Sequence, residues 1–407
     1  HNITFAGSSV APTLTESGLQ TLNIYGSSVW QSGMPAINIS YFYYRNTGEA
    51  KTITSNGVKT GNRDVYLEET NSISLSDAFS VELFLYHQAG TFRTNGHDLT
   101  IGYSFDARTS SPKTIILGSS QVYMTATRAI FNTNQANITL NAGTSHIHFP
   151  NISSFQFTEG ILPYQGQTFY NVSFENSNGG GSLGGFQTGT VYFNRVEFKG
   201  NGNIYQNNQF KELVFNAGKT YTLQANKTQT TQSWILGGTP CAVTFVQNST
   251  TGLRANINVT GGNTNFNFGN LKEINASGQT LHFGAQSTIA GQNNNNITYD
   301  PYNPGAFAGL GADWLFHTVD DADSSTYLIP TDAFYGNSST TYSWHKLNDS
   351  NYNPATVLGT DNTIDIRNFG FGTYKVEVTY TDGASITCVV SDEINILQRT
   401  VAPTASS

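Results

Sequence analysis

The sequence has few charged residues and almost no cysteine. Only 11% of its 407 residues are charged, and its two cysteines are Cys241 and Cys388. These two lie far apart, in what we predict to be different domains, so we expect no disulfide between them, and their spacing fits no zinc motif. The fold must therefore be held together by packing and backbone hydrogen bonds.

The sequence also lacks basic runs and long apolar runs. Its formal net charge is −8, and no cluster of Lys and Arg is present. Because phosphate binding requires such clusters, nucleic acid is not expected as a partner. No stretch reaches 18 consecutive apolar residues, so the sequence predicts no membrane-spanning segment.

What the sequence does contain favours β structure. Aromatic residues make up 13% of the chain, mostly Phe and Tyr, and there are 40 glycines. Short runs such as "LTIGYSF", "FYNVSF" and "VYFNRVEF" alternate apolar and polar residues and are separated by Gly and Asn. This period-two pattern predicts strands, and no run of about ten residues shows a helical stripe. We therefore predict an all-β protein.

Short phrases recur along the middle of the chain. Val172-x-Phe174 is followed 24 residues later by Val196-x-Phe198, and similar pairs occur at Phe155-x-Phe157 and Leu213-x-Phe215. A repeat of about twenty residues with Gly and Asn turns is typical of a parallel β-solenoid (β-helix), in which equivalent residues of stacked coils form ladders. Strand spacings of about 8 to 12 residues also fit a β-sandwich, which stays the alternative.

Changes in pattern divide the chain into five segments. We predict an N-terminal cap and the first coils at 1–110, the solenoid proper at 111–302, and a linker at 303–314. Alternating strands at 315–398 predict a small β-sandwich, and 399–407 reads as a second linker. Because the sequence starts at His1 without Met or signal peptide, we expect it to be a piece of a larger protein.

The C-terminal quarter resembles a known class of module. Trp344, "LGTDNTIDI" (358–366) and "GTYKVEVTYTDGASITC" (372–388) resemble the Ig-like or PKD-like modules of large secreted Bacteroidetes proteins, with Tyr374 placed like a tyrosine corner. The preceding repeats are similar to those of cell-surface adhesins of that phylum, including gliding-motility adhesins exported by the type IX secretion system.

This resemblance implies a non-enzymatic, extracellular cell-surface segment that attaches to polysaccharide or a solid surface and contributes to gliding. The other implied partner is the secretion and motility machinery of the outer membrane. No cofactor is implied, apart from structural calcium considered below.

An enzyme is the main alternative, because β-helices also carry polysaccharide lyases and hydrolases. That chemistry needs paired carboxylates. No aspartate occurs between Asp106 and Asp300, and we expect Glu175 and Glu197 to face different ways. We therefore predict no catalytic residues, and we keep a carbohydrate-active lyase, hydrolase or glycan-binding domain as the runner-up. A phage tailspike is a third possibility.

Two clusters could hold a metal ion. His146 and His148 lie on one face of a predicted strand, a spacing that can bind zinc or copper, but the sequence identifies no third ligand. Asp320, Asp321 and Asp323 could hold structural calcium at the entry to the C-terminal module. For the histidines a surface or ladder role is the favoured interpretation, and for the aspartates a solvated turn.

Glycan binding would use exposed rings and loops. The glycines at 179–185 predict a lateral loop leaving the solenoid, and loops of this kind carry binding residues. Aromatic rings can stack on sugar faces. The candidate rings are Tyr164, Tyr170, Tyr192, Tyr205 and Trp234.

Overall fold

The computed structural model confirms an all-β protein containing a parallel β-solenoid of about 11 turns. Within the described residues, the helical structure is one 3-10 turn, η2 (Ile366–Asn368), and no helix is long and apolar enough to span a membrane. The structure describes residues 2–5, 12–15, 17–60, 64–127, 130–132, 137–151, 153–155, 168–184, 190–239, 242–284, 287, 289, 292–299, 314–316, 327–328, 340–348, 355–381 and 387–398.

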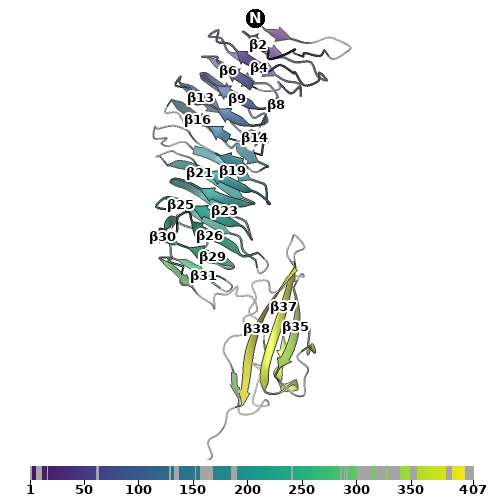
Figure 1. Cartoon of the computed structure of the whole chain (residues 1–407), viewed down its shortest axis with the longest axis vertical. Helices are drawn as coiled ribbons and strands as arrows, with labels where there is room; N and C mark the ends of the chain where they lie inside the picture. The colour runs from purple at the N-terminus through teal and green to yellow at the C-terminus, as the bar shows by residue number, and fades with distance from the viewer. Residues whose placement is uncertain are drawn as a thin grey trace, which may run out of the picture.

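In the N-terminal half, the chain visits three walls in turn, and every ladder in these walls is parallel (Figure 1). One wall is a seven-stranded sheet of β1 (Ile3–Thr4), β3 (Ser28–Val29), β5 (Lys51–Thr54), β7 (Ser72–Leu75), β10 (Gly90–Arg93), β13 (Lys113–Ile116) and β16 (Ile138–Asn141). A second is a six-stranded sheet of β2 (Thr21–Ile24), β4 (Tyr41–Tyr44), β6 (Asp64–Leu67), β9 (Phe84–His87), β12 (Ser104–Asp106) and β15 (Ile130–Asn132).

The third wall is a ten-stranded sheet that continues into the second half of the solenoid. It contains β8 (Phe79–Val81), β11 (Leu99–Ile101), β14 (Gln121–Met124), β17 (His146–Phe149), β19 (Thr168–Phe174), β21 (Val191–Phe198), β23 (Asn208–Phe215), β25 (Thr228–Leu236), β27 (Ala255–Val259) and β30 (Ile274–Gly278). Opposite it in the second half stands another six-stranded sheet, of β18 (Ser153–Phe155), β20 (Gly180–Leu183), β22 (Asn201–Ile204), β24 (Thr220–Leu223), β26 (Thr244–Asn248) and β29 (Gly269–Lys272). A three-stranded sheet of β28 (Asn265–Phe266), β31 (Leu281–Phe283) and β32 (Ile297–Tyr299) ends the stack.

The predicted ladders inside the solenoid are confirmed. Val172 pairs with Val196, and Phe174 pairs with Phe198, and all four side chains are buried. The two Phe rings stack with their centroids 4.6 Å apart. One part of the predicted alignment was wrong: we aligned Phe155-x-Phe157 with Val172-x-Phe174, but the residue that pairs with Phe174 is Phe149.

The glycine-rich spacer is not the lateral loop that we predicted. Residues 180–183 form strand β20, which pairs with β18 and β22 inside the wall. A Cβ on Gly181 would lie 2.5 Å from the ring of Phe174. Gly181 therefore makes room for the inner Phe ladder, and the absence of a side chain at this position is a packing requirement.

The C-terminal region has its own sheet and core. Four strands, in the order β33 (Trp314–Phe316), β38 (Thr387–Gln398), β37 (Gly372–Thr381) and β35 (Thr340–Leu347), form a sheet in which β35, β37 and β38 are antiparallel. A two-stranded pair, β34 (Tyr327–Leu328) and β36 (Ile364–Asp365), completes it. Trp344 and Tyr374 are fully buried in this core, and β35, which contains Trp344, is an edge strand of the four-stranded sheet. Phe268 of the solenoid belongs to the same apolar cluster.

Candidate binding site on the ten-stranded sheet

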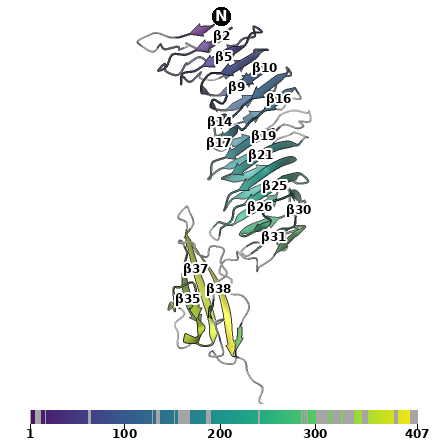
Figure 2. The same ribbon diagram turned by 180° about the vertical axis from the view of Figure 1, so that it is seen from behind.

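The ten-stranded sheet widens in its middle. Strands β19, β21, β23 and β25 contain 7, 8, 8 and 9 residues, whereas the other strands of this sheet contain 3 to 5. Because side chains alternate along a strand, longer strands add outward-facing positions as well as core positions. We call the outer face of these four strands the broad wall; its strands lie in the middle of the stack in Figure 2.

One hollow on the broad wall is lined by polar, charged and glycine residues. It has a volume of about 450 Å³ and spans strands β21, β23 and β25 and the turn after β27. We call it the polar groove; its lining residues are Asn194, Arg195, Lys211, Glu212, Gln232, Ser233, Thr260, Gly261 and Gly262. These amide, hydroxyl and charged groups offer donors and acceptors along four successive coils.

A second hollow lies further along the same strands. It has a volume of about 840 Å³, and its lining includes Lys199, Lys219 and the apolar side chains of Ile235 and Phe245. Ile235 is 42% exposed and Phe245 is 45% exposed. The broad wall thus carries the polar groove, and an amphipathic hollow, in which two lysines accompany exposed apolar groups, lies beyond the ends of its strands towards β26.

The acidic residues of the broad wall are held in ion pairs. Arg195 pairs with Glu212 and, at 3.4 Å, with Glu197. Our expectation that Glu175 and Glu197 face different ways was wrong. Glu175 follows the inward-facing Phe174, and Glu197 precedes the inward-facing Phe198, so alternation turns both carboxylates outward on the same face.

Glu175 belongs to a cluster with two histidines, which we call the histidine cluster. The carboxylate oxygen of Glu175 lies 2.8 Å from His148 Nδ1 and accepts a hydrogen bond of 2.9 Å from the Ser173 hydroxyl. His146 Nε2 lies 2.9 Å from the same hydroxyl, and the two imidazole centroids are 3.8 Å apart. The third metal-type ligand that the sequence did not reveal is therefore Glu175, from the neighbouring coil.

Hydrogen bonding fixes the roles of these atoms. Because the Ser173 hydroxyl donates to a carboxylate, its oxygen accepts from His146 Nε2–H. Burial, helped by the charge of His148, lowers the pKa of His146 to about 4, so this ring is neutral at pH 7. Burial acts to raise the pKa of Glu175, but the hydrogen bonds from His148 and Ser173 outweigh it and lower the pKa. Glu175 is therefore a carboxylate.

These atoms do not form a hydrolytic triad. In a triad, one histidine contacts the nucleophile with one ring nitrogen and the acid with the other. Here His146 contacts Ser173 through Nε2, whereas His148 contacts both Glu175, at 2.8 Å, and Ser173, at 3.5 Å, through one nitrogen, Nδ1. Ser173 is also only 2% exposed. The arrangement is suited to holding a cation and poorly suited to attacking a substrate.

The predicted glycan-binding residues do not form one site. Tyr192 is 38% exposed on β21, whereas Tyr205 is 37% exposed after β22 on the opposite wall. Tyr170 is half-buried. Trp234 is 1% exposed and packs inside against Phe215 and Phe266, so its proposed role as an exposed platform was wrong. Tyr164, Asp320, Asp321, Asp323 and Cys241 lie outside the described residues.

Outward-facing, half-buried rings instead gather on the N-terminal six-stranded sheet. Tyr43, Tyr66 and Tyr86 occupy one register column, and their rings stack with centroids 4.3 and 4.5 Å apart. The Arg45 guanidinium covers the ring of Tyr43 at 4.1 Å. Because each ring covers the face of the next, this tyrosine ladder presents edges and hydroxyl groups to solvent. It offers little face area for stacking a sugar.

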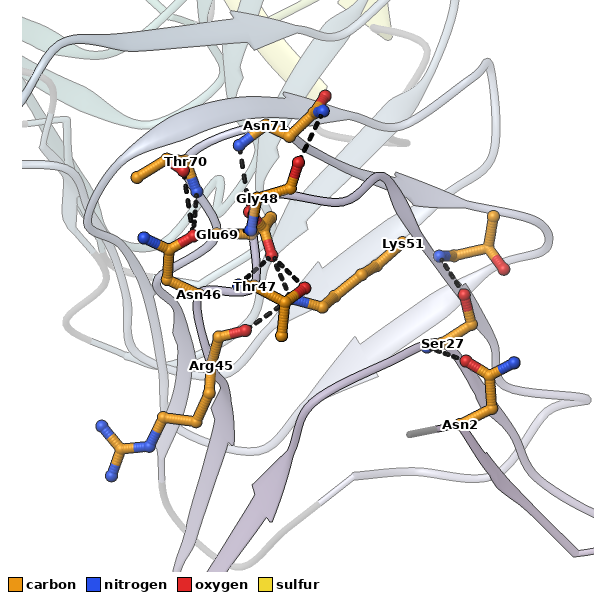
Figure 3. Close-up of polar contacts among 11 residues, drawn as sticks. Asn2, Ser27, Arg45, Asn46, Thr47, Gly48, Lys51, Glu69, Thr70 and Asn71 are labelled. Atoms are coloured by element: carbon orange, nitrogen blue, oxygen red, sulfur yellow. Dashed lines mark hydrogen bonds and ion pairs between the residues drawn. The ribbon is translucent and has the colours of Figure 1, made fainter.

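A buried ion pair in the early coils is structural. Lys51 and Glu69 are buried and in contact, and Glu69 also accepts hydrogen bonds from the backbone N–H groups of Thr47, Gly48 and Asn71 (Figure 3). Burial alone would raise the pKa of Glu69, but the contact with Lys51, followed by the hydrogen bonds from Thr47 and Asn71, brings this pKa to about 2. With its oxygens engaged this way, the carboxylate serves to fix the turn between coils.

Four residues of the polar groove were not predicted from the sequence, because aromatic residues and aspartates were taken as the signs of a site. They are Arg195, Lys211, Glu212 and Gln232. A weak signal was present: charged residues are scarce, yet "FNRVEFKG" and "FKELVF" place five of them within two repeats. Comparisons with models of known protein families, with curated proteins and with solved structures found no match to this chain.

Proposed function

We propose that this chain is a non-enzymatic segment of a secreted bacterial cell-surface adhesin, and that it attaches to polysaccharide through the broad wall. The observation that carries the proposal is the polar groove, which runs across four coils. A polymer of sugars presents hydroxyl groups at regular intervals, and a groove with regularly spaced donors and acceptors is complementary to it.

The solenoid architecture supports a mechanical role. Each coil is bonded to its neighbours by parallel ladders, and a single sheet joins ten strands. Such a stack holds its binding groups at fixed separations, so several weak sugar contacts act together. Weak contacts repeated along a rigid surface give an attachment that is strong overall and reversible at each point.

The charged groups support binding without catalysis. Glu197 and Glu212 are paired with Arg195, and Glu175 is bonded to His148. A glycosidase requires one carboxyl group to remain protonated as a general acid. The pKa of Glu175 is lowered, which is the opposite of what that role requires.

The C-terminal region fits the same class of protein. Its buried Tyr374 donates a hydrogen bond to the carbonyl oxygen of Gly370, four residues earlier, a contact similar to that of a tyrosine corner. We propose that this region is an Ig-like module, which in an adhesin would act as a spacer beside the solenoid. Its resemblance to secreted modules also underlies the proposed extracellular location and the proposed contribution to gliding.

A carbohydrate-active enzyme remains the second candidate, on one specific observation. Glu175, just beyond the end of β19, and Glu197, on the adjacent strand β21, face the same way. Two carboxylates on neighbouring coils could flank a glycosidic bond. If the protein is an enzyme, polysaccharide cleavage should depend on both residues. If it is a non-enzymatic adhesin, no cleavage is expected.

The binding proposal can be tested with two matched double variants. Lys211→Ala/Gln232→Ala removes two exposed side chains from the polar groove. Gln247→Ala/Lys272→Ala removes the same residue types from register partners on the second six-stranded sheet. Retention on immobilised polygalacturonate, alginate and cellulose is measured for both variants and the wild type.

We expect the groove variant to bind at least one of these polymers about tenfold more weakly than the wild type, because tenfold corresponds to the loss of about one hydrogen bond. The control variant should bind within about twofold of the wild type. Equal binding by both variants, or no retention of the wild type on any polymer, would overturn the proposal.

A further inference from the structure

We propose that His146, His148 and Glu175 bind one Zn²⁺ ion on the outer face of the ten-stranded sheet. The three side chains come from two adjacent strands, β17 and β19, whose register places His146 beside Asn171 and His148 beside Ser173. Glu175 continues the same outward row just beyond the end of β19. The proposal does not rest on polysaccharide binding.

The residue types and their spacing suit zinc. Two histidines separated by one residue on a strand direct both imidazoles to the same side. Zinc sites commonly combine two histidines with a carboxylate, with metal–ligand bonds of about 2.0–2.2 Å. The ligand atoms of these three side chains all lie within 4.8 Å of one another. In a tetrahedral site they would lie roughly 3.4 Å apart, a difference that side-chain rotations can close.

Neighbouring groups already orient the ligands. Ser173 accepts from His146 Nε2–H, which leaves the Nδ1 lone pair of the neutral ring available to a metal ion. Gln121 lies 2.8 Å from His148 Nε2, and the ring of Tyr123 stacks on His148 with centroids 4.7 Å apart. Such second-shell contacts are typical of metal-binding histidines, since they fix the tautomer and the ring orientation.

The site is accessible, and its charge favours a cation. The side chains of His148 and Glu175 are 13% and 27% exposed, so an ion can enter from solvent. Zn²⁺ would replace the proton that lies between His148 Nδ1 and Glu175, and that proton would pass to the buffer. One carboxylate and two neutral imidazoles would hold the ion, with a fourth position left for water.

Bound zinc would connect two consecutive coils. His146 and His148 belong to β17 and Glu175 follows β19, so the ion would join these coils through bonds stronger than the present hydrogen bonds. The expected consequence is a Zn²⁺-dependent increase in stability, because an ion that binds only the folded state raises the Tm. Ca²⁺ and Mg²⁺ prefer oxygen ligands and should not bind here.

The experiment measures Zn²⁺ binding by isothermal titration calorimetry and the Tm with and without Zn²⁺, for wild type and four variants. His146→Ala, His148→Ala and Glu175→Gln each remove one ligand. His282→Ala is the matched control, because His282 is also on a solenoid strand and is hydrogen-bonded to Thr298. Circular dichroism of each variant without metal checks that the solenoid is folded.

The wild type and His282→Ala should each bind one Zn²⁺ at this site and show a Tm increase of at least about 2 °C. Each ligand variant should bind at least about 100-fold more weakly, more than is typical when only a second-shell contact is lost. Absence of a Zn²⁺-induced Tm increase in the folded wild type would overturn the proposal. So would equal affinities in the wild type and the ligand variants, or Ca²⁺ binding as tight as Zn²⁺.

Discussion

Among the ladders of aromatic rings that run along this solenoid, we compare one inside it with one outside it. The inner ladder, Phe149, Phe174 and Phe198, has ring centroids 5.1 and 4.6 Å apart. The outer ladder is the tyrosine ladder, in which the spacings are 4.3 and 4.5 Å. The spacings are similar because both follow the distance between hydrogen-bonded strands. The two ladders differ in solvent exposure: the Phe rings are buried, whereas the Tyr rings are only partly buried.

This comparison shows that stacking in a solenoid follows from coil spacing, whatever the function of the ring. A residue that repeats in register stacks on its copies, inside or outside. An exposed aromatic row is therefore weak evidence for a sugar-binding platform, because the rings already occupy one another's faces. The polar groove has no such self-covering arrangement, which is why we assign binding to it.

The largest difference between the ladders should appear in stability. Phe198→Ala removes a fully buried ring and should lower the free energy of unfolding by about 3–5 kcal/mol. Tyr66→Ala removes a ring that is stacked but partly exposed to solvent, and should lower the free energy of unfolding by only about 0.5–1.5 kcal/mol. Urea unfolding of both variants measures these losses. Equal losses would contradict the view that burial, and not stacking, provides most of the stability.

A smaller effect is expected from Gly181→Ala, which tests the packing around the inner ladder. The added Cβ would lie 2.5 Å from the Phe174 ring, and overpacking of this kind typically costs about 1–3 kcal/mol. The double variant Gly181→Ala/Phe174→Leu should recover part of the loss, because the smaller side chain makes room. If Gly181→Ala unfolds at the same urea concentration as the wild type, residues 180–183 are not packed on the ladder.

The smallest expected difference between the two ladders is in how stability depends on pH, because only the tyrosine ladder contains groups that ionise. Burial, with the nearby charges of Asp64 and Asp106, raises the pKa of Tyr86 to about 12, and burial together with Asp64 raises the pKa of Tyr66 above its usual range. Unfolded tyrosine titrates near pH 10. The stabilising contribution is therefore complete below about pH 10 and declines as the pH rises towards the folded-state pKa.

The alkaline effect is measured as the change in Tm between about pH 9 and pH 11.5, in the window that these pKa shifts define. Tyr66→Phe/Tyr86→Phe keeps both rings and removes both hydroxyl groups, so it serves as the control. The wild type should lose more Tm than this variant. An equal loss would mean that the tyrosine ladder does not contribute to the pH dependence.

The part of the fold that could be predicted is the part controlled by alternation within a strand. The phrases around Val172 and Val196 gave both the inward positions and their pairing, because a repeated apolar pattern has one good register. The alignment of Phe157 with this ladder was wrong because the coils differ in length. A second phrase with the same pattern, ending at Phe149, is the true neighbour.

The parts that could not be predicted depend on neighbouring coils. Glu175 lies 27 residues after His148 in sequence and becomes its partner only through the pairing of β17 with β19. Gly181 was read as part of a loop because glycine usually marks one, and only the position of the Phe174 ring explains a glycine inside a strand. Trp234 was read as exposed because the inner side of β25 could not be identified from an irregular polar sequence.

The central claim is that this solenoid binds polysaccharide and does not cleave it. The most direct test incubates the protein, with and without Zn²⁺, on the polymer that retains it best, and follows both bound protein and new reducing or unsaturated chain ends. We predict retention with no new chain ends above the level without protein. Release of chain ends by the wild type that is lost in Glu175→Gln or Glu197→Gln would contradict the claim and establish an enzyme.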